Sequence, residues 1–387
     1  MDFSLTEEQS MFRDMFRSFA QKEIAKVAEH TDKNNQVPPE LLRKAAEQGM
    51  LGALAPDTYG GAALDPVSYA LMLEEIGRVC MSTAVVIAHH TSQATQAILD
   101  FGADAQKEQF LPLLASGEAI GAFALTEPDA GSDIKAVTTR AVREGGEVVL
   151  NGVKTWVGNA GIAGLFIVFA TSNPKANGRG MSAFIVEKDT PGLKIGHREP
   201  TLGLRGATYH TLYLDGVRVP EANRLGAEGD GAVIAERVLD HFRWALAAIG
   251  LGVCAAAVEA GVKFAAERIQ FGGPIAHKQA IQNYIADSSA QVEGLRYLVY
   301  HTAWQAGQGT GLSTAAAYAK LFAAQAARFV TDRMVQVHGG YGYMEDYAIA
   351  RMYRNSRALD LIGGTDELMR VAIAGDLLKS QQLEIKP

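Results

Sequence analysis

The segment Gly121-Ala-Phe-Ala-Leu-Thr-Glu-Pro-Asp-Ala-Gly-Ser-Asp133 lies where the chain changes from a helical to a β-rich pattern. Its Pro, Asp, Gly and Ser residues are typical of a turn. A glycine-rich turn with hydroxyl groups also exposes backbone N–H groups that can bind an anion or a ring carbonyl. The segment is therefore either an ordinary turn or part of a binding site, and the sequence on both sides is needed to distinguish the two.

The sequence before this segment predicts helices. Thr6 and Gln9 form a capping pattern at a helix start, and apolar residues follow at helical spacing, namely Met11, Phe12, Met15, Phe16 and Phe19. Further helices are predicted over residues 40–48, 67–79 and 81–101. The first third of the chain is therefore expected to be an α-helical domain, which we assign to residues 1–120.

The sequence after this segment predicts strands and then helices again. Val148-Val-Leu-Asn-Gly-Val153 predicts a hairpin with an Asn-Gly turn. Short β-rich runs follow at residues 166–170, 183–187 and 213–219, and long helices are predicted over 238–268, 313–337 and 366–383. We assign residues 121–230 to an antiparallel β domain and 231–387 to a second helical domain. This order lacks βαβ alternation, which disfavours a Rossmann fold.

Composition limits the classes of function. The chain has 387 residues, 36 Lys and Arg, 43 Asp and Glu, a formal net charge of −7 and 48% hydrophobic residues, which is typical of a globular enzyme rather than a nucleic-acid-binding protein. Its two cysteines, Cys80 and Cys254, exclude a disulfide framework, and metal-ligand spacings are missing. We expect no integral membrane segment, and the location to be the cytoplasm or, for a processed protein, an organellar matrix.

Three further motifs accompany Gly121–Asp133. They are Lys154-Thr-Trp-Val-Gly-Asn159, Arg268-Ile-Gln-Phe-Gly272 followed by Gln279, and Gln336-Val-His-Gly-Gly-Tyr-Gly-Tyr343 followed by Gly363-Gly-Thr-Asp-Glu367. In order and spacing the set resembles the acyl-CoA dehydrogenase family over essentially the whole chain. The resemblance implies an α+β fold with an N-terminal helical domain, a middle antiparallel β-barrel or sandwich and a C-terminal four-helix bundle. It also implies FAD as cofactor and a homotetramer.

The resemblance also assigns the FAD-binding residues. Thr126 would hydrogen-bond the flavin ring, Trp156 would shield its edge, and Arg268 would pair with the pyrophosphate of FAD from a neighbouring subunit. Taken singly, Trp156 is more often a core aromatic, and Arg268 is a solvated charge that favours a helix C-terminus. The full set is Phe123, Leu125, Thr126, Gly131, Ser132, Trp156, Gly158, Arg268, Phe271, Gln279, Gln336, Gly339, Gly340, Thr365 and Glu367.

The substrate site is assigned in the same way. In the family, an Asp and an Arg at the positions of Asp240 and Arg243 hold the CoA end of an acyl-CoA, although these residues also fit a solvated i,i+3 pair on a helix. The implied substrate-binding set is Ser132, Asp240, Phe242, Arg243 and Gly364.

Three positions depart from the family pattern. The catalytic glutamate of most members corresponds to Gly363, and that of other members corresponds to Phe242, so neither known base is present. Gly158 replaces the Thr or Ser that usually lies beside the flavin. A positioned base is typically worth about 10²–10⁴ in rate, so another group must take the proton or the reaction must differ.

His89 and His90 are the replacement bases that the sequence offers, because their helix borders the acyl pocket in the family. Packed or surface histidines are the alternative interpretation. The resemblance implies an FAD-dependent dehydrogenase that converts an acyl-CoA, cyclic or branched, to an enoyl-CoA and passes electrons to an electron-transfer flavoprotein. The alternatives are 1,4-dehydrogenation, a lyase- or desulfinase-type elimination, and a non-catalytic flavin or acyl-CoA binding protein.

Overall fold

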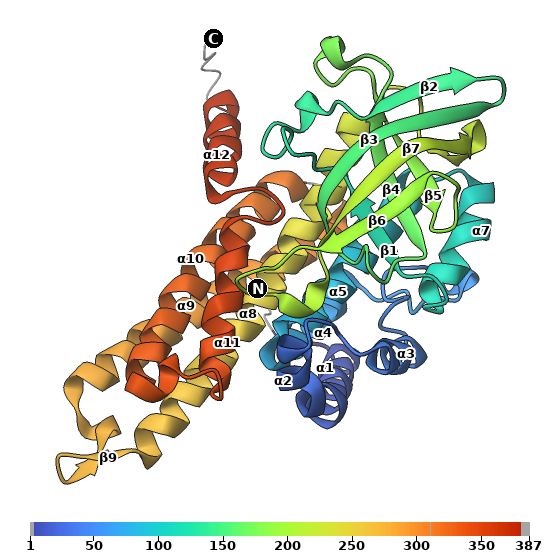
Figure 1. The fold of residues 1–387 in the computed structure, drawn as a ribbon. Helices are drawn as coiled ribbons and strands as arrows, with labels where there is room; N and C mark the ends of the chain where they lie inside the picture. Colours follow the sequence, from blue (N-terminus) through green and yellow to red (C-terminus); the bar gives the residue numbers. More distant parts are fainter. Residues whose placement is uncertain (1–3, 310, 381–387) are drawn as a thin grey trace.

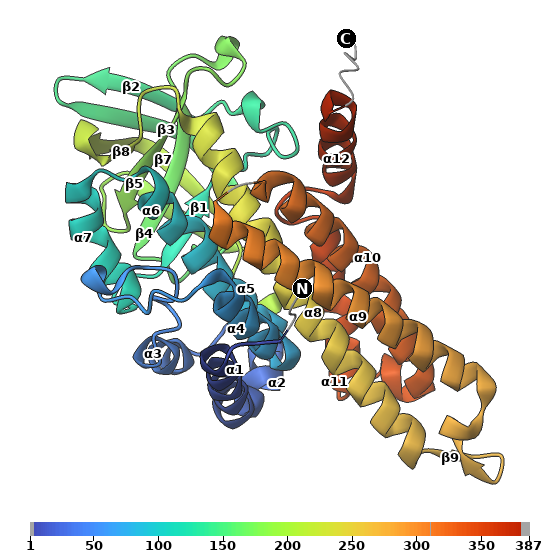
Figure 2. The ribbon, with the colours of Figure 1, turned by 180° about the vertical axis from the view of Figure 1, so that it is seen from behind.

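The computed structural model describes residues 4–309 and 311–380. Figures 1 and 2 show three parts: a cluster of N-terminal helices, a β domain beside it, and a long helical bundle that extends away from both. This helix–sheet–helix order confirms the predicted fold class. The long helix of the bundle runs past the other two parts, so that all three domains meet around its first half.

The N-terminal part is built from short helices. The predicted cap at its first helix is confirmed, because Thr6 Oγ1 accepts from Gln9 N and Gln9 Oε1 accepts from Thr6 N, each at 3.1 Å. A π-helical segment, η4 (His89–Thr95), interrupts a buried helix between α5 and α6. The helices are α1 (Glu7–Phe19), α2 (Ala28–Lys33), α3 (Pro39–Glu47), α4 (Pro66–Val79), α5 (Met81–Ala88), α6 (Gln96–Phe101) and α7 (Asp104–Ala115).

The middle part is a single eight-stranded sheet. Its main path runs β6-β7-β3-β2-β4-β5-β8, with β1 paired to β4. Most pairs are antiparallel as predicted, but β1 and β2 each lie parallel to β4. The strands are β1 (Gly121–Ala124), β2 (Arg140–Glu144), β3 (Glu147–Val157), β4 (Leu165–Thr171), β5 (Met181–Glu187), β6 (Leu193–Arg198), β7 (His210–Pro220) and β8 (Arg224–Leu225).

The predicted hairpin turn at Asn151-Gly152 is wrong. These residues lie inside β3, where the pairing with β7 shifts register between Leu150 and Gly152. The turn that joins β2 to β3 is instead at Gly145-Gly146, with Glu144 paired to Glu147. Asn151 Oδ1 accepts from Gly216 N at 2.8 Å, so the polar side chain of the Asn-Gly pair binds the backbone of the neighbouring strand β7.

The C-terminal part is a bundle of long helices: α8 (Gly231–Glu267), α9 (Gln279–Gln308), α10 (Leu312–His338), α11 (Ala348–Ser356) and α12 (Asp366–Ser380). Helix α9 is absent from the sequence-based prediction. The last predicted helix is confirmed to Ser380, and its predicted residues 381–383 lie outside the described part. A small hairpin, β9 (Ile269–Gln270) with β10 (Gly273–Pro274), joins α8 to α9 at the end of the bundle farthest from the sheet (Figures 1 and 2).

Helix α8 forms the core of the bundle. Among the described helices it alone is long and apolar enough to cross a membrane by length and composition, but 72% of its apolar window is buried inside the fold. Its inward side chains, including Trp244, Leu246 and Ile249, belong to the largest apolar cluster of the molecule. Helix α8 is therefore a core helix of the fold.

Candidate active site and cofactor site

The first two sequence motifs come together where β1 and β3 end, a region of residues 123–132 and 154–158 that we call the sheet edge. Thr126 follows β1, and its carbonyl oxygen accepts from Thr155 N in β3 at 2.9 Å. The next residue, Trp156, has a φ of +52° and is 60% exposed. Trp156 is therefore not a core aromatic. The edge presents a half-buried threonine beside an exposed flat ring.

His89 lies against Gly158, one of the three positions at which this chain departs from the family pattern. A Cβ atom added to Gly158 would lie 2.5 Å from His89 Nε2, so the His89 ring occupies the space that a side chain at 158 needs. The same ring stacks on Phe242, with centroids 4.8 Å apart. The two departures at residues 158 and 242 are thus packed around one histidine.

The partners of His89 fix its tautomer. His89 Nδ1 lies 2.6 Å from Gln93 Oε1, an acceptor, so Nδ1 carries the proton and Nε2 keeps its lone pair. Tyr209 Oη lies 3.3 Å from Nε2 and donates to it. Burial lowers the pKa of His89 to about 4, against a smaller opposing effect of Gln93, and the ring is neutral at pH 7. Sequence reasoning missed Gln93 and Tyr209.

His90 has a different environment. Its Nδ1 accepts from Gly121 N at 2.9 Å, and its Nε2 donates to the Leu114 carbonyl oxygen at 3.1 Å. Both ring nitrogens are therefore used to join the helix to β1 and to the end of α7. The structure does not support His90 as a proton acceptor, and its role is the packed, structural alternative.

Gly363 lies next to this cluster, with Arg243 and Asp240. Arg243 Nε donates to the Gly363 carbonyl oxygen at 2.9 Å, and Arg243 Nη1 pairs with Asp240 Oδ1 at 2.6 Å. Gly363 has a φ of +72°, and an added Cβ would lie 3.0 Å from Leu246 and 3.4 Å from Phe242. Both the backbone and the packing therefore disfavour a glutamate at residue 363.

Sequence reasoning also missed Lys320 on α10. The Lys320 side chain is 1% exposed and its ammonium group donates to the Gly364 carbonyl oxygen. It lies 3.5 Å from Asp366 Oδ1, while Thr365 Oγ1 caps α12 by accepting from Leu368 N. Burial lowers the pKa of Lys320 to about 8 despite Asp366. A lysine among the alanines of an apolar helix face was the available signal.

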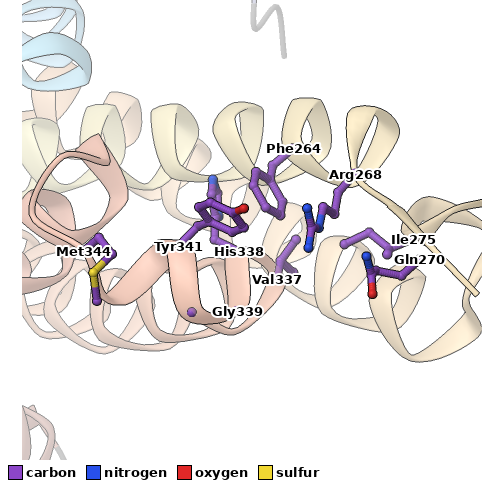
Figure 3. Close-up of a pocket in the computed structure, with 10 residues that line it drawn as sticks. Phe264, Arg268, Gln270, Ile275, Val337, His338, Gly339, Tyr341 and Met344 are labelled. Carbon is purple, nitrogen blue, oxygen red and sulfur yellow. The ribbon is translucent and has the colours of Figure 1, made fainter.

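A second site lies at the far end of the bundle. Figure 3 shows Phe264, Arg268 and Tyr341 around a cavity of about 410 Å³ between the end of α8 and the end of α10. The guanidinium of Arg268 lies over the Tyr341 ring, 5.1 Å from its centroid. Among residues 4–309 and 311–380 no carboxylate pairs with Arg268, so its charge is available to an anion.

The predicted cofactor residues thus fall into two groups. Phe123, Leu125, Thr126, Gly131, Ser132, Trp156 and Gly158 lie at the sheet edge, and Arg268, Phe271, Gln279, Gln336, Gly339 and Gly340 lie at or near the distal end of the bundle. Thr365 and Glu367 lie at the start of α12, beside the Gly363 turn. Figures 1 and 2 show the β9 hairpin at the opposite end of the molecule from the sheet, so one chain does not bring the two groups together.

The chain's residues fit FAD at both groups. Added Cβ atoms at Gly131, Gly339 and Gly340 would meet nothing within 4 Å, so these glycines leave open space that protein packing does not require. Gly339 has φ +59° and ψ −138°, a conformation essentially restricted to glycine. An unpaired arginine beside exposed glycine backbone suits a diphosphate, and the exposed Trp156 suits an aromatic ring.

Comparison with known proteins agrees with this geometry. The chain matches the models of the acyl-CoA dehydrogenase N-terminal domain over residues 6–118, the middle domain over 122–217 and the C-terminal domain over 229–378. It is 44% identical over 374 residues to an acyl-CoA dehydrogenase of Bacillus subtilis, which covers 97% of this chain and 99% of the relative.

Solved structures show the same fold. A chain from a structural study of the electron transferring flavoprotein of Acidaminococcus fermentans superposes with a TM-score of 0.96 at 40% identity, covering 98% of this chain and 100% of that one. The structure of PigA with FAD and proline superposes with a TM-score of 0.94 at 30% identity, covering 97% and 99%. The predicted resemblance is confirmed, and this chain belongs to the acyl-CoA dehydrogenase family.

Proposed function

We propose that this acyl-CoA dehydrogenase uses FAD to oxidise an acyl-CoA thioester to the enoyl-CoA, and that His89 takes the proton a glutamate takes elsewhere in the family. The observation that carries the proposal is the His89 cluster. A neutral imidazole, whose Nε2 keeps its lone pair and accepts from the Tyr209 hydroxyl, lies between Gly158, beside the flavin-binding edge, and Phe242, at one of the two vacant glutamate positions.

Different residues of the chain would bind the substrate and accept the proton. Asp240 and Arg243 would hold the CoA end, as a partly buried pair beside the Gly363 turn. His89 Nε2 would accept the proton that leaves the α-carbon, while Gln93 holds the ring by its Nδ1 proton. Bound FAD supplies the acceptor for the hydride that leaves the β-carbon. Loss of one proton and one hydride converts the saturated acyl group to the enoyl group.

The low pKa of His89 has a consequence for this role. A base with a pKa of about 4 is ready in its neutral form at every pH above 5, but it is a weak base. The acyl group must therefore be one whose proton is more acidic than that of a simple thioester, or substrate binding must change the surroundings of the ring.

Proton exchange tests this function directly. FAD-loaded enzyme is incubated anaerobically in D₂O with straight-chain, branched and cyclic acyl-CoAs, and both deuterium uptake into the acyl group and flavin bleaching are followed. His89→Gln is expected to lower the exchange rate by about 10²-fold or more, with acyl-CoA affinity retained. His90→Gln is the matched control, and is expected to lower stability but not exchange.

Three outcomes separate the alternatives. Bleaching with enoyl-CoA formation indicates a dehydrogenase, product without bleaching indicates an elimination, and binding alone indicates a non-catalytic protein. Exchange that is unchanged in His89→Gln would contradict the assignment of the base.

We also propose a homotetramer that passes its electrons to an electron-transfer flavoprotein. The support for the oligomer is the separation of the two cofactor groups, because the β9 hairpin, which directly follows Arg268, lies at the opposite end of the molecule from β1, which ends just before Thr126. A second subunit would supply the missing half of each FAD site. The cysteines Cys80 and Cys254 are both free and buried, which fits the reducing environment of the cytoplasm.

A further inference from the structure

Two motif residues at the sheet edge have no role in the function above. Glu127 follows Thr126, and Lys154 begins the motif that contains Trp156. Lys154 Nζ donates to Glu127 Oε1 at 2.7 Å and to the Leu125 carbonyl oxygen at 3.0 Å. The Lys154 side chain is 0% exposed and that of Glu127 is 4% exposed, so this is a fully buried ion pair.

The carboxylate of Glu127 is saturated with donors. Its Oε2 accepts from the Thr138 backbone N–H and hydroxyl, both at 2.7 Å, and its Oε1 accepts from Thr139 N at 3.0 Å as well as from Lys154. Burial alone would raise the pKa of Glu127, but Lys154 and these donors lower it to about 2. Burial lowers the pKa of Lys154 to about 8, so both groups are charged at pH 7.

The Glu127–Lys154 pair is part of a junction between the two segments that would face the flavin, residues 125–127 and 154–155. Lys154 binds the Leu125 carbonyl oxygen and the Glu127 carboxylate, and Thr155 N binds the Thr126 carbonyl oxygen between them. Residues 125–127 are therefore all attached to residues 154–155. Thr126 lies within this junction and Trp156 directly follows it, so the geometry of the junction sets their relative positions.

We propose that Glu127 and Lys154 are positioning residues for the flavin ring, which act by fixing Thr126 and Trp156 without contacting the flavin. The inference rests on the proposed FAD site at the sheet edge. Desolvation of two charges commonly costs as much as their attraction gains, so a well-packed apolar pair would give equal or greater stability. An apolar pair would lack hydrogen-bond donors. In this chain Lys154 Nζ donates to the Leu125 carbonyl oxygen and thereby orients the loop.

The experiment compares release of FAD from purified holoenzyme with thermal stability. Lys154→Met is expected to weaken FAD binding by about tenfold to a hundredfold, the usual effect of losing hydrogen bonds to a charged group, and to destabilise the protein because Glu127 is left unpaired. The double variant Lys154→Met with Glu127→Gln removes the unpaired charge. We expect it to regain stability while FAD binding stays weak and the flavin absorption spectrum stays altered.

Glu74→Gln is the matched control. Glu74 is 3% exposed and pairs with Arg296 Nη1 at 2.8 Å, which joins α4 to α9 outside the sheet. This variant is expected to lose stability with unchanged FAD release and spectrum. The inference is overturned if FAD binding recovers with stability in the double variant, or if Lys154→Met binds FAD like the wild type. A wild-type protein that binds no FAD would instead overturn the proposed function.

Discussion

Placing a side chain at residue 158 should disturb His89 more than any other part of the site. An added Cβ would lie 2.5 Å from His89 Nε2 and 2.6 Å from its Cδ2, well inside van der Waals contact. Gly158→Ser therefore forces the ring out of the position in which it binds Gln93 and stacks on Phe242. Overpacking of a well-packed core costs about 1–3 kcal/mol, and we expect the free energy of unfolding to fall by that amount.

Removing the histidine should remove this cost. His89→Ala alone is expected to destabilise the protein by about 2–3 kcal/mol, because it leaves Gln93 Oε1 without its donor and removes the ring stacked on Phe242. In the His89→Ala background Gly158→Ser has room. The double variant should therefore be about 1–3 kcal/mol more stable than the sum of the two single effects predicts.

The assay is denaturant unfolding of the two single variants and the double variant on flavin-free protein, so that altered FAD binding does not enter. Gly131→Ser is the control, because an added Cβ there meets nothing within 4 Å, and its stability should equal that of the wild type. The same variants are tested for α-proton exchange, which should be absent in both variants that lack His89. Additive effects of the two substitutions within about 0.5 kcal/mol would refute the reasoning.

The other predictions concern pH and the distal site. Burial lowers the pKa of His89 and His90 to about 4 each, so between pH 6.5 and 4 the unfolded chain binds protons that the folded chain does not. Stability should therefore fall as pH falls through this range, by about 1.4 kcal/mol per pH unit for each histidine; a flat pH dependence in acid denaturation would contradict this burial. Arg268→Ala should lower FAD occupancy without lowering turnover per bound flavin, measured from the flavin-to-protein absorbance ratio, and full occupancy would count against a diphosphate contact. Gel filtration should show a tetramer, and a monomer with stoichiometric FAD would contradict the shared cofactor site.

Local chemistry determined much of this protein from the sequence alone. The Thr6–Gln9 cap, the long apolar helices and the helix–strand–helix order depend on neighbouring residues, and the structure has them where they were predicted. The four motifs and their spacing identified the family for the same reason, because each motif is a short contiguous segment that is recognised without knowledge of the fold. The vacant glutamate positions at Gly363 and Phe242 were also visible without coordinates.

Only the tertiary structure shows which side chain lies beside Phe242, one of the two vacant glutamate positions. The contact of His89 with Gly158 joins residues far apart in the chain, and no local pattern distinguishes His89 from His90, although one faces the site and the other binds backbone. The Asn151-Gly152 pair shows the converse, since a strong local turn signal lost to pairing with β7 on one side and β2 on the other. Local propensities differ by about 1 kcal/mol or less per residue, whereas burial of a strand or a ring within the fold contributes several times that amount, so packing decided wherever the two disagreed.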